Sequence, residues 1–115
     1  MMFERGALLL VPFPFTDLSG NKRRPVLALT GPDRHGDFIA MPVTSRPQSD
    51  EFALLLRTTD LSRGSLPLAS WIRTDRIVTL SSTLVVKSLA SVAEPLVANA
   101  ARRLWTMIIG APLAK

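Results

Sequence analysis

Hydrophobic residues recur in short runs along the chain before residue 82. Clusters of Gly, Pro, Asp and Ser separate these runs at intervals of about 8 to 15 residues, a spacing typical of a small β-barrel or β-sandwich. The pattern predicts strands over residues 7–12, 25–30, 38–45, 52–56, 70–73 and 76–80. The stretch 57–69 has little periodicity and is predicted to be a loop that holds at most one short paired segment.

The pattern changes its period near the carboxyl end. Ser91 and Glu94 have the spacing of a capping box, and Gly110 is a typical helix stop, so we expect a helix over residues 92–109. Polar residues form one narrow stripe on this helix, namely Asn99, Arg102, Arg103 and Thr106. The rest of the circumference is apolar and broader than one small barrel covers, so we expect a homodimer.

The composition restricts the class of protein. A chain of 115 residues is expected to form a single domain over residues 1–115. Fourteen Lys and Arg against nine Asp and Glu give a net charge of +5, which favours a polyanionic partner such as RNA or DNA. Cysteine is absent, which excludes disulfides and thiolate chemistry and fits a cytoplasmic protein. No apolar run approaches the roughly 18 residues that span a membrane.

A dense basic cluster stands at a predicted loop-to-strand junction. Lys22, Arg23 and Arg24 directly precede Pro25 and the apolar run PVLALT. The proline ring fixes its own φ and biases the preceding residue toward extended geometry, so the strand should aim the Arg24 guanidinium. An aimed guanidinium suits phosphate binding or phosphate chemistry.

A second polar group follows the strand predicted over residues 38–45. Thr44 and Ser45 stand at its end, and Arg46 stands at the mouth of the next loop. A plain strand end remains the alternative interpretation of this segment. Hydroxyl and guanidinium groups are the chemistry that the sequence offers here.

Other catalytic templates find little support in the sequence. His35 is the only histidine and lies in the Gly/Asp/Pro turn PDRHGD, so a two-histidine acid–base pair is excluded within one chain and we expect His35 to be exposed. No serine lies in a GxSxG elbow, and no GxxxxGK or GxGxxG motif is present. The acidic residues do not form a metal-ligand spacing. We therefore expect neither a metal nor a cofactor.

Three segments together resemble a known family. VPFPFTDLSGNKRRPVLAL, IAMPVTSR and SWIRTDRIVTL, in this order and spacing, are similar to the MazF/PemK-type toxins of bacterial toxin–antitoxin systems. The resemblance implies a mainly β fold, a small SH3-like curved β-barrel with a C-terminal α-helix, that forms a homodimer. It also implies a sequence-specific, metal-independent endoribonuclease that cleaves single-stranded RNA, mRNA included, through attack of the ribose 2′-hydroxyl. An acidic cognate antitoxin would be its partner.

The resemblance assigns roles to individual residues. Arg24 and Thr44 match the catalytic pair of the family. The residues expected to contact RNA are Phe15, Lys22, Arg23, Ser45 and Arg46. Trp71 is expected either to stack on an unpaired base or to belong to the core. The chain departs from the family pattern at Ala7, where many relatives have Asp, and at Arg46, where Gln often follows the Thr element.

Two alternatives stay open at this point. The same barrel also serves as a non-catalytic module that binds nucleic acid or inhibits a topoisomerase. A subunit with a decayed site that only binds an antitoxin is the other alternative. Cleavage of RNA by the purified protein in the presence of a chelator distinguishes them.

Overall fold

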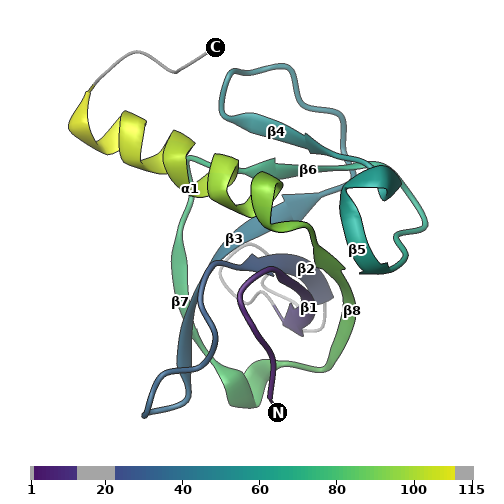
Figure 1. Cartoon of the computed structure of the whole chain (residues 1–115), viewed down its shortest axis with the longest axis vertical. Coiled ribbons are helices and arrows are strands. Elements are labelled where there is room, and N and C mark those ends of the chain that lie inside the picture. Colours follow the sequence, from purple (N-terminus) through teal and green to yellow (C-terminus); the bar gives the residue numbers. More distant parts are fainter. Residues whose placement is uncertain (1, 13–22, 111–115) are drawn as a thin grey trace.

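The computed structural model describes residues 2–12 and 23–110, and these residues form a curved antiparallel sheet with one α-helix (Figure 1). The strands are β1 (Ala7–Pro12), β2 (Arg23–Ala28), β3 (Asp37–Thr44), β4 (Ala53–Leu56), β5 (Leu61–Gly64), β6 (Ser70–Arg73), β7 (Val78–Ser81) and β8 (Lys87–Val92). Two short 3-10 helices lie between strands, η1 (Thr58–Asp60) after β4 and η2 (Ser82–Leu84) after β7, and α1 (Glu94–Ile109) is the last element.

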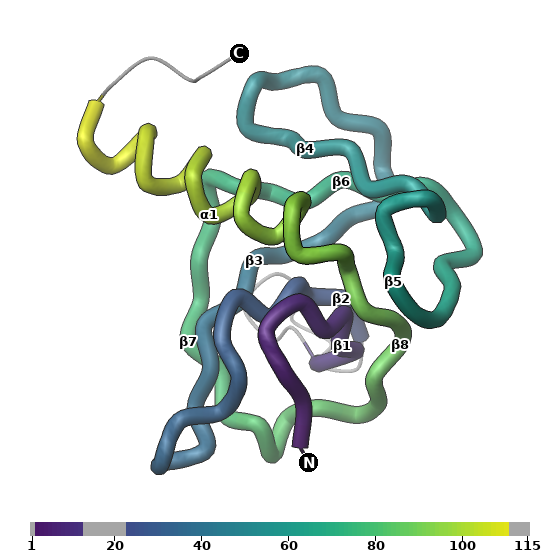
Figure 2. Tube along the Cα trace, in the orientation of Figure 1, coloured from purple at the N-terminus to yellow at the C-terminus, as the bar shows by residue number. Residues whose placement is uncertain are grey.

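The strand β3 organises the sheet. The strand order is β4-β6-β3-β2-β1-β8-β5, and β7 also pairs with β3. One edge of β3 pairs with β2, while Ala40 pairs with Val78 of β7 and Val43 pairs with Ile72 of β6 along the other edge. Strands β6 and β7 therefore lie one after the other along the same edge of β3. The other edge of β6 pairs with β4 (Figure 2).

The two faces of the sheet bury separate apolar clusters because side chains alternate along each strand. Leu8, Leu27 and Met41 contribute to the cluster that also contains Val97 and Ala100 of α1. Leu9 and Val26 lie in the other cluster, around the buried ring of Phe38. Helix α1 crosses the sheet on the side of the first cluster (Figure 1).

The observed elements confirm the predicted fold class, a mainly β curved sheet with a C-terminal helix, and all six predicted strands to within two residues at each end. The short paired segment allowed for in residues 57–69 is β5, which pairs with β8. The sequence pattern contains no prediction for β8, because its sequence KSLASV is rich in small and polar residues of low strand propensity. Pairing with β1 and β5 on both sides makes this segment a strand.

The predicted capping box at the start of the helix is wrong. Ser91 lies in β8, where it pairs with Ala7, and the N-cap of α1 is Ala93, which makes no side-chain cap bond. The backbone of Ser91 belongs to the strand pair with β1, so Ser91 cannot take the position of an N-cap residue. The Glu94 carboxylate instead binds Arg5, with 2.8 Å between Arg5 Nη2 and Glu94 Oε1, and this hydrogen bond lowers the pKa of Glu94.

The carboxyl end of the helix follows the prediction, and Gly110 caps it with a φ of 75°. The outer face near this end is apolar: Trp105, Ile108 and Ile109 have exposed fractions of 61%, 64% and 55%. In the predicted polar stripe, Thr106 is buried and its hydroxyl donates to the carbonyl of Arg102. In the described part of the chain, no helix has the length and apolarity needed to cross a membrane.

Candidate active site

One cleft brings together five of the seven residues that the sequence singles out. The cleft has a volume of about 430 Å³ and lies where β2 begins and β3 ends. The predicted residues that line it are Arg23, Arg24, Thr44, Ser45 and Arg46. Apolar side chains, Leu66 and Leu89 among them, contribute to its walls. The other two predicted residues, Phe15 and Lys22, lie outside the described residues.

The strand register places Arg24 and Thr44 on the same face of the sheet. β2 and β3 are antiparallel neighbours, and Val26 is opposite Pro42. Two residues further along both strands, the same register sets Arg24 opposite Thr44, and directly opposed residues of an antiparallel pair project to the same side. A guanidinium and a hydroxyl from adjacent strands thus share one face.

Arg24 has a donor that the described residues do not use. Its Nε atom is buried and has no hydrogen-bond partner among residues 2–12 and 23–110. Most buried polar atoms in proteins are hydrogen-bonded, so an unpaired donor at the edge of a cleft favours a site for an anionic ligand. The guanidinium has a planar set of donors, which matches two oxygens of one phosphate.

The hydroxyl of Thr44 has a defined partner. Thr44 Oγ1 accepts the backbone N–H of Arg46 at 3.1 Å, a local turn of the kind that Ser and Thr make at strand ends. A hydroxyl has one hydrogen to donate besides its acceptor capacity. No hydrogen bond among the described residues uses the hydroxyl hydrogen of Thr44, which can therefore donate to a ligand in the cleft.

The cleft is positively charged. Three arginines line it, Arg23, Arg24 and Arg46, and no carboxylate is among its described lining residues. Arg23 and Arg46 are exposed, while Arg24 is half-buried. Positive charges between apolar walls focus the electric field in the cleft, which attracts an anionic ligand.

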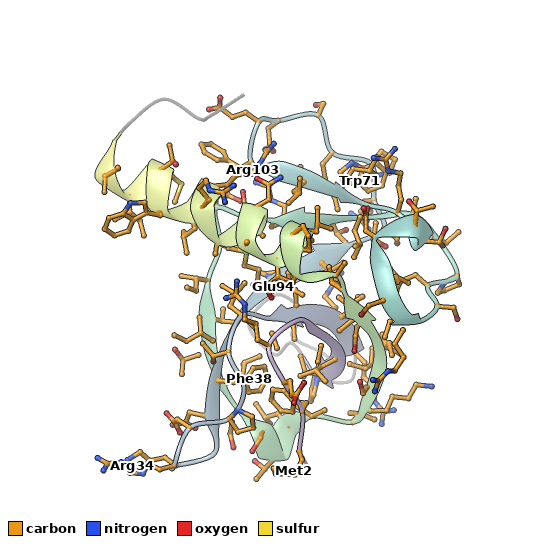
Figure 3. All side chains as sticks on the ribbon, in the orientation of Figure 1. Met2, Arg34, Phe38, Trp71, Glu94 and Arg103 are labelled. Atoms are coloured by element: carbon orange, nitrogen blue, oxygen red, sulfur yellow. The ribbon has the colours of Figure 1, made fainter. Side chains whose placement is uncertain are left out.

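Trp71 lies on the sheet face that Thr44 occupies. It is opposite Thr44 on one side and Leu55 on the other, so the three side chains form a row across β3, β6 and β4. Trp71 is half-buried and is not among the residues of either buried cluster (Figure 3). Of the two alternatives left open for Trp71, its half-buried position outside both clusters favours a ring that is not part of the core.

His35 lies in an exposed turn, as the sequence predicts. The Asp33 carboxylate accepts the backbone N–H groups of His35 and Asp37 at 2.8 and 3.0 Å, and these bonds lower the pKa of Asp33. Among residues 2–12 and 23–110, no three His, Cys, Asp or Glu side chains gather closely enough to hold a metal ion.

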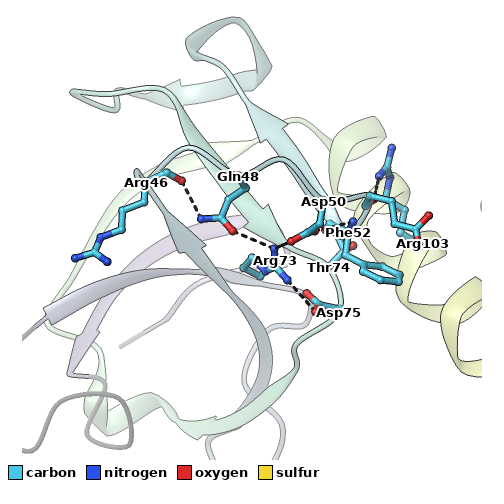
Figure 4. Close-up of polar contacts among 9 residues, drawn as sticks. Arg46, Gln48, Asp50, Phe52, Arg73, Thr74, Asp75 and Arg103 are labelled. Atoms are coloured by element: carbon cyan, nitrogen blue, oxygen red, sulfur yellow. Dashed lines mark hydrogen bonds and ion pairs between the residues drawn. The ribbon is translucent and has the colours of Figure 1, made fainter.

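The sequence analysis missed the role of Arg73. Its guanidinium donates to Gln48 and Asp50 of the loop after β3 and to Asp75 of its own turn (Figure 4). The bond to Asp50 first, and then the charge and bond of Asp75, raise the pKa of Arg73, and the bond to Arg73 lowers the pKa of Asp50. The signal lies in the segment SWIRTDRI, whose Arg and Asp are two residues apart, but the partners in the loop are visible only in the folded chain.

The fold has close counterparts among solved structures. MazF (Form-I) from Deinococcus radiodurans matches with a TM-score of 0.75 and 23% identity over 96% of this chain and 98% of that one. MazE-MazF (Form-II) from the same organism matches with a TM-score of 0.73 and 22% identity over 97% and 99% of the two chains. An endoribonuclease in complex with its cognate antitoxin from a mycobacterial species matches with a TM-score of 0.65 and 22% identity over 97% of both chains.

Sequence comparison identifies the family. A comparison with curated proteins finds no match. The profile of the PemK-like, MazF-like toxins of type II toxin-antitoxin systems matches residues 4–108, which is nearly the whole chain. The chain therefore belongs to the family of PemK-like, MazF-like toxins of type II toxin-antitoxin systems.

Proposed function

We propose that this toxin is a metal-independent endoribonuclease that cleaves single-stranded RNA, mRNA included, at short sequences in the cytoplasm. The observation that carries the proposal is the placement of Arg24 and Thr44 on one face of the sheet, at a cleft lined by three arginines. Membership in the family of PemK-like, MazF-like toxins and the likeness to solved endoribonucleases support it.

The proposed reaction needs only the groups of RNA and the cleft, with water as the carrier of protons. The ribose 2′-oxygen attacks the adjacent phosphorus, the bond from phosphorus to the 5′-oxygen breaks, and the products are a 2′,3′-cyclic phosphate and a 5′-hydroxyl. The attacking hydroxyl loses its proton to water, and the leaving oxygen takes one from water. Negative charge gathers on the non-bridging oxygens in the transition state, where preorganised donors lower the barrier most.

Arg24 and Thr44 are the proposed donors to those oxygens. A guanidinium stays protonated in proteins, so Arg24 acts through charge and hydrogen bonds and not as a base. The Thr44 hydroxyl donates its free hydrogen to the same group, while the N–H of Arg46 fixes the direction of its oxygen. Both donors are strongest when the charge is greatest, which is the requirement for catalysis.

The remaining residues of the site are proposed to hold the RNA. Arg23 and Arg46 are exposed at the cleft and would bind flanking phosphates, with Ser45 between them as a further hydroxyl. The half-buried ring of Trp71 would stack on an unpaired base beside Thr44. Phe15 and Lys22 keep the roles predicted from the sequence.

The test is the incubation of purified protein with a long mixed RNA in the presence of EDTA. We expect cuts at a small set of recurring sequences and fragments that end in a 2′,3′-cyclic phosphate, mapped by primer extension and by resistance of the 3′ ends to ligation. Protein with Arg24→Ala, purified in parallel, is the control for contaminating ribonuclease. Loss of cleavage in EDTA would contradict the metal-independent reaction, and RNA binding without any cut would favour the non-catalytic alternative.

We also propose that the active species is a homodimer joined through α1 and that an acidic antitoxin segment occupies the cleft. The exposed Trp105, Ile108 and Ile109 follow helical spacing and form one apolar face that the described chain leaves uncovered. The solved MazE-MazF structures with the same fold support an antitoxin partner. The three arginines of the cleft attract an acidic peptide for the reason that they attract RNA.

The dimer is tested by placing charges on the helix. We expect the wild-type chain to be dimeric at micromolar concentration and the variant Trp105→Glu with Ile108→Glu to be monomeric, because two carboxylates in an apolar interface cost several kcal/mol, on the order of a thousandfold in affinity. Light scattering measures the mass. Ile77→Glu, at an exposed isoleucine between β6 and β7, is the matched control and should stay dimeric. A monomeric wild-type chain would contradict the proposal.

A further inference from the structure

A continuous series of hydrogen bonds connects Arg73 to the hydroxyl of Thr44. Arg73 Nη1 donates to Gln48 Oε1 at 3.1 Å, and Gln48 Nε2 donates to the carbonyl of Arg46 at 3.0 Å (Figure 4). The N–H of Arg46 in turn donates to Thr44 Oγ1 at 3.1 Å. The series runs from β6 through the loop that follows β3 and ends at a proposed catalytic group.

The orientation of the Gln48 amide follows from its two partners. A guanidinium can only donate and a carbonyl can only accept, so the amide oxygen must face Arg73 and the amide nitrogen must face Arg46. Gln48 therefore fits this position as a bridge with one acceptor end and one donor end. A side chain with only one of these functions cannot make both bonds.

Arg73 is anchored more firmly than the loop that it holds. Its side chain has an exposed fraction of 12%, and its two terminal nitrogens also bind the carboxylates of Asp50 and Asp75, the latter at 2.9 Å. The loop between Ser45 and Phe52 contains no regular secondary structure, and Asp50 and Gln48 attach it to β6 from two points. Thr74 adds a hydrogen bond of 2.6 Å to the carbonyl of Phe52 at the end of this loop.

We infer that Arg73 is a positioning residue, which fixes the loop through Gln48 and thereby sets the direction in which Thr44 presents its hydroxyl hydrogen. The inference rests on the proposed ribonuclease function for its catalytic consequence. Without Gln48, the backbone of Arg46 is no longer held, and its N–H no longer stays within hydrogen-bond distance of Thr44 Oγ1. The Thr44 side chain can then rotate among its staggered rotamers. A donor that is misplaced by about 1 Å costs on the order of a hundredfold in rate.

A direct catalytic role fits Arg73 less well. Arg73 is not among the residues that line the cleft, and both of its terminal nitrogens are already engaged by three acceptors. Two carboxylates beside it neutralise the charge that a phosphate would need. Arg24 and Arg46, by contrast, line the cleft and have no acidic partner among the described residues.

The test uses the bridge and not the anchor, because substitution of a mostly buried arginine can unfold the protein. Gln48→Ala is expected to lower kcat for a short RNA substrate by about tenfold or more with little change in KM, since the lost contact aligns a transition-state donor. Gln48→Glu keeps the acceptor for Arg73 and loses the donor for Arg46, so it should be nearly as poor. Ser49→Ala, in the same exposed loop, is the matched control and should match the wild type.

A double-mutant cycle separates positioning from an independent role. If Gln48 acts through Thr44, Gln48→Ala should have almost no further effect in a Thr44→Val background, and the double variant should lose about a hundredfold and not about a thousandfold. Losses that multiply fully would overturn the inference, because they would show that the bridge serves another group.

A second measurement does not depend on RNA cleavage. Three-bond NMR couplings report the χ1 rotamer of Thr44, and we expect one rotamer in the wild-type chain and in Ser49→Ala but averaged couplings in Gln48→Ala and Arg73→Lys. Unchanged Thr44 couplings in Gln48→Ala would overturn the inference even if the protein cleaves RNA. Averaged couplings in a protein without ribonuclease activity would overturn the proposed function and leave the positioning role of Arg73 supported.

Discussion

Replacement of Arg24 by Ala is expected to reduce RNA cleavage by at least about a thousandfold, in line with other arginines that stabilise a charged phosphoryl transition state. Fluorescence or filter binding of an RNA with a deoxynucleotide at the cut site should show a much smaller loss, because Arg23 and Arg46 remain at the cleft. The expected pattern is therefore a collapse of kcat with RNA binding largely retained.

The fold should tolerate this change. Arg24 is the second residue of β2, and its buried Nε has no partner to lose among the described residues. Thermal unfolding of Arg24→Ala should therefore resemble that of the wild-type chain. An unfolded variant would instead mean that Arg24 is a structural residue.

The variant Arg24→Lys examines the geometry of the donor. A lysine ammonium keeps the charge but lacks the planar fork that matches two phosphate oxygens, so the Lys variant should also be poor. Near-normal turnover by Arg24→Lys would contradict the proposed two-oxygen contact and leave only a need for charge.

The positions of Arg24 and Thr44 could be predicted from the sequence because they depend on local rules. Pro25 and the apolar run after it indicate where β2 begins, and the end of the run IAMPV indicates where β3 ends. Antiparallel pairing of the two strands then brings their ends together. These local patterns were sufficient because the strands of the folded sheet begin and end near the residues that the patterns indicate.

The hydrogen bonds of Arg73 to the loop after β3 could not be predicted from the sequence in the same way. Its contacts with Gln48 and Asp50 join residues separated by 25 and 23 positions in the chain. They depend on the pairing of β6 with β3 and on the path of a loop without regular structure, and no local pattern encodes either. The wrong prediction at Ser91 has a related cause, since tertiary strand pairing overrode a local capping signal.

Replacement of Thr44 by Val should lower kcat by a factor of about 100 or more, the effect of removing one preorganised donor to a developing oxyanion. Valine keeps the shape and the strand preference of threonine but removes the acceptor of the Arg46 N–H, so stability should fall by about 1 kcal/mol. Ser45→Ala is the comparison and should lose less kcat, because Ser45 follows the last residue of β3 and successive side chains of a strand point to opposite faces. Single-turnover cleavage of one RNA by the two variants gives the comparison. A larger loss in Ser45→Ala than in Thr44→Val would move the catalytic hydroxyl by one residue, and with it the end point of the series of hydrogen bonds from Arg73.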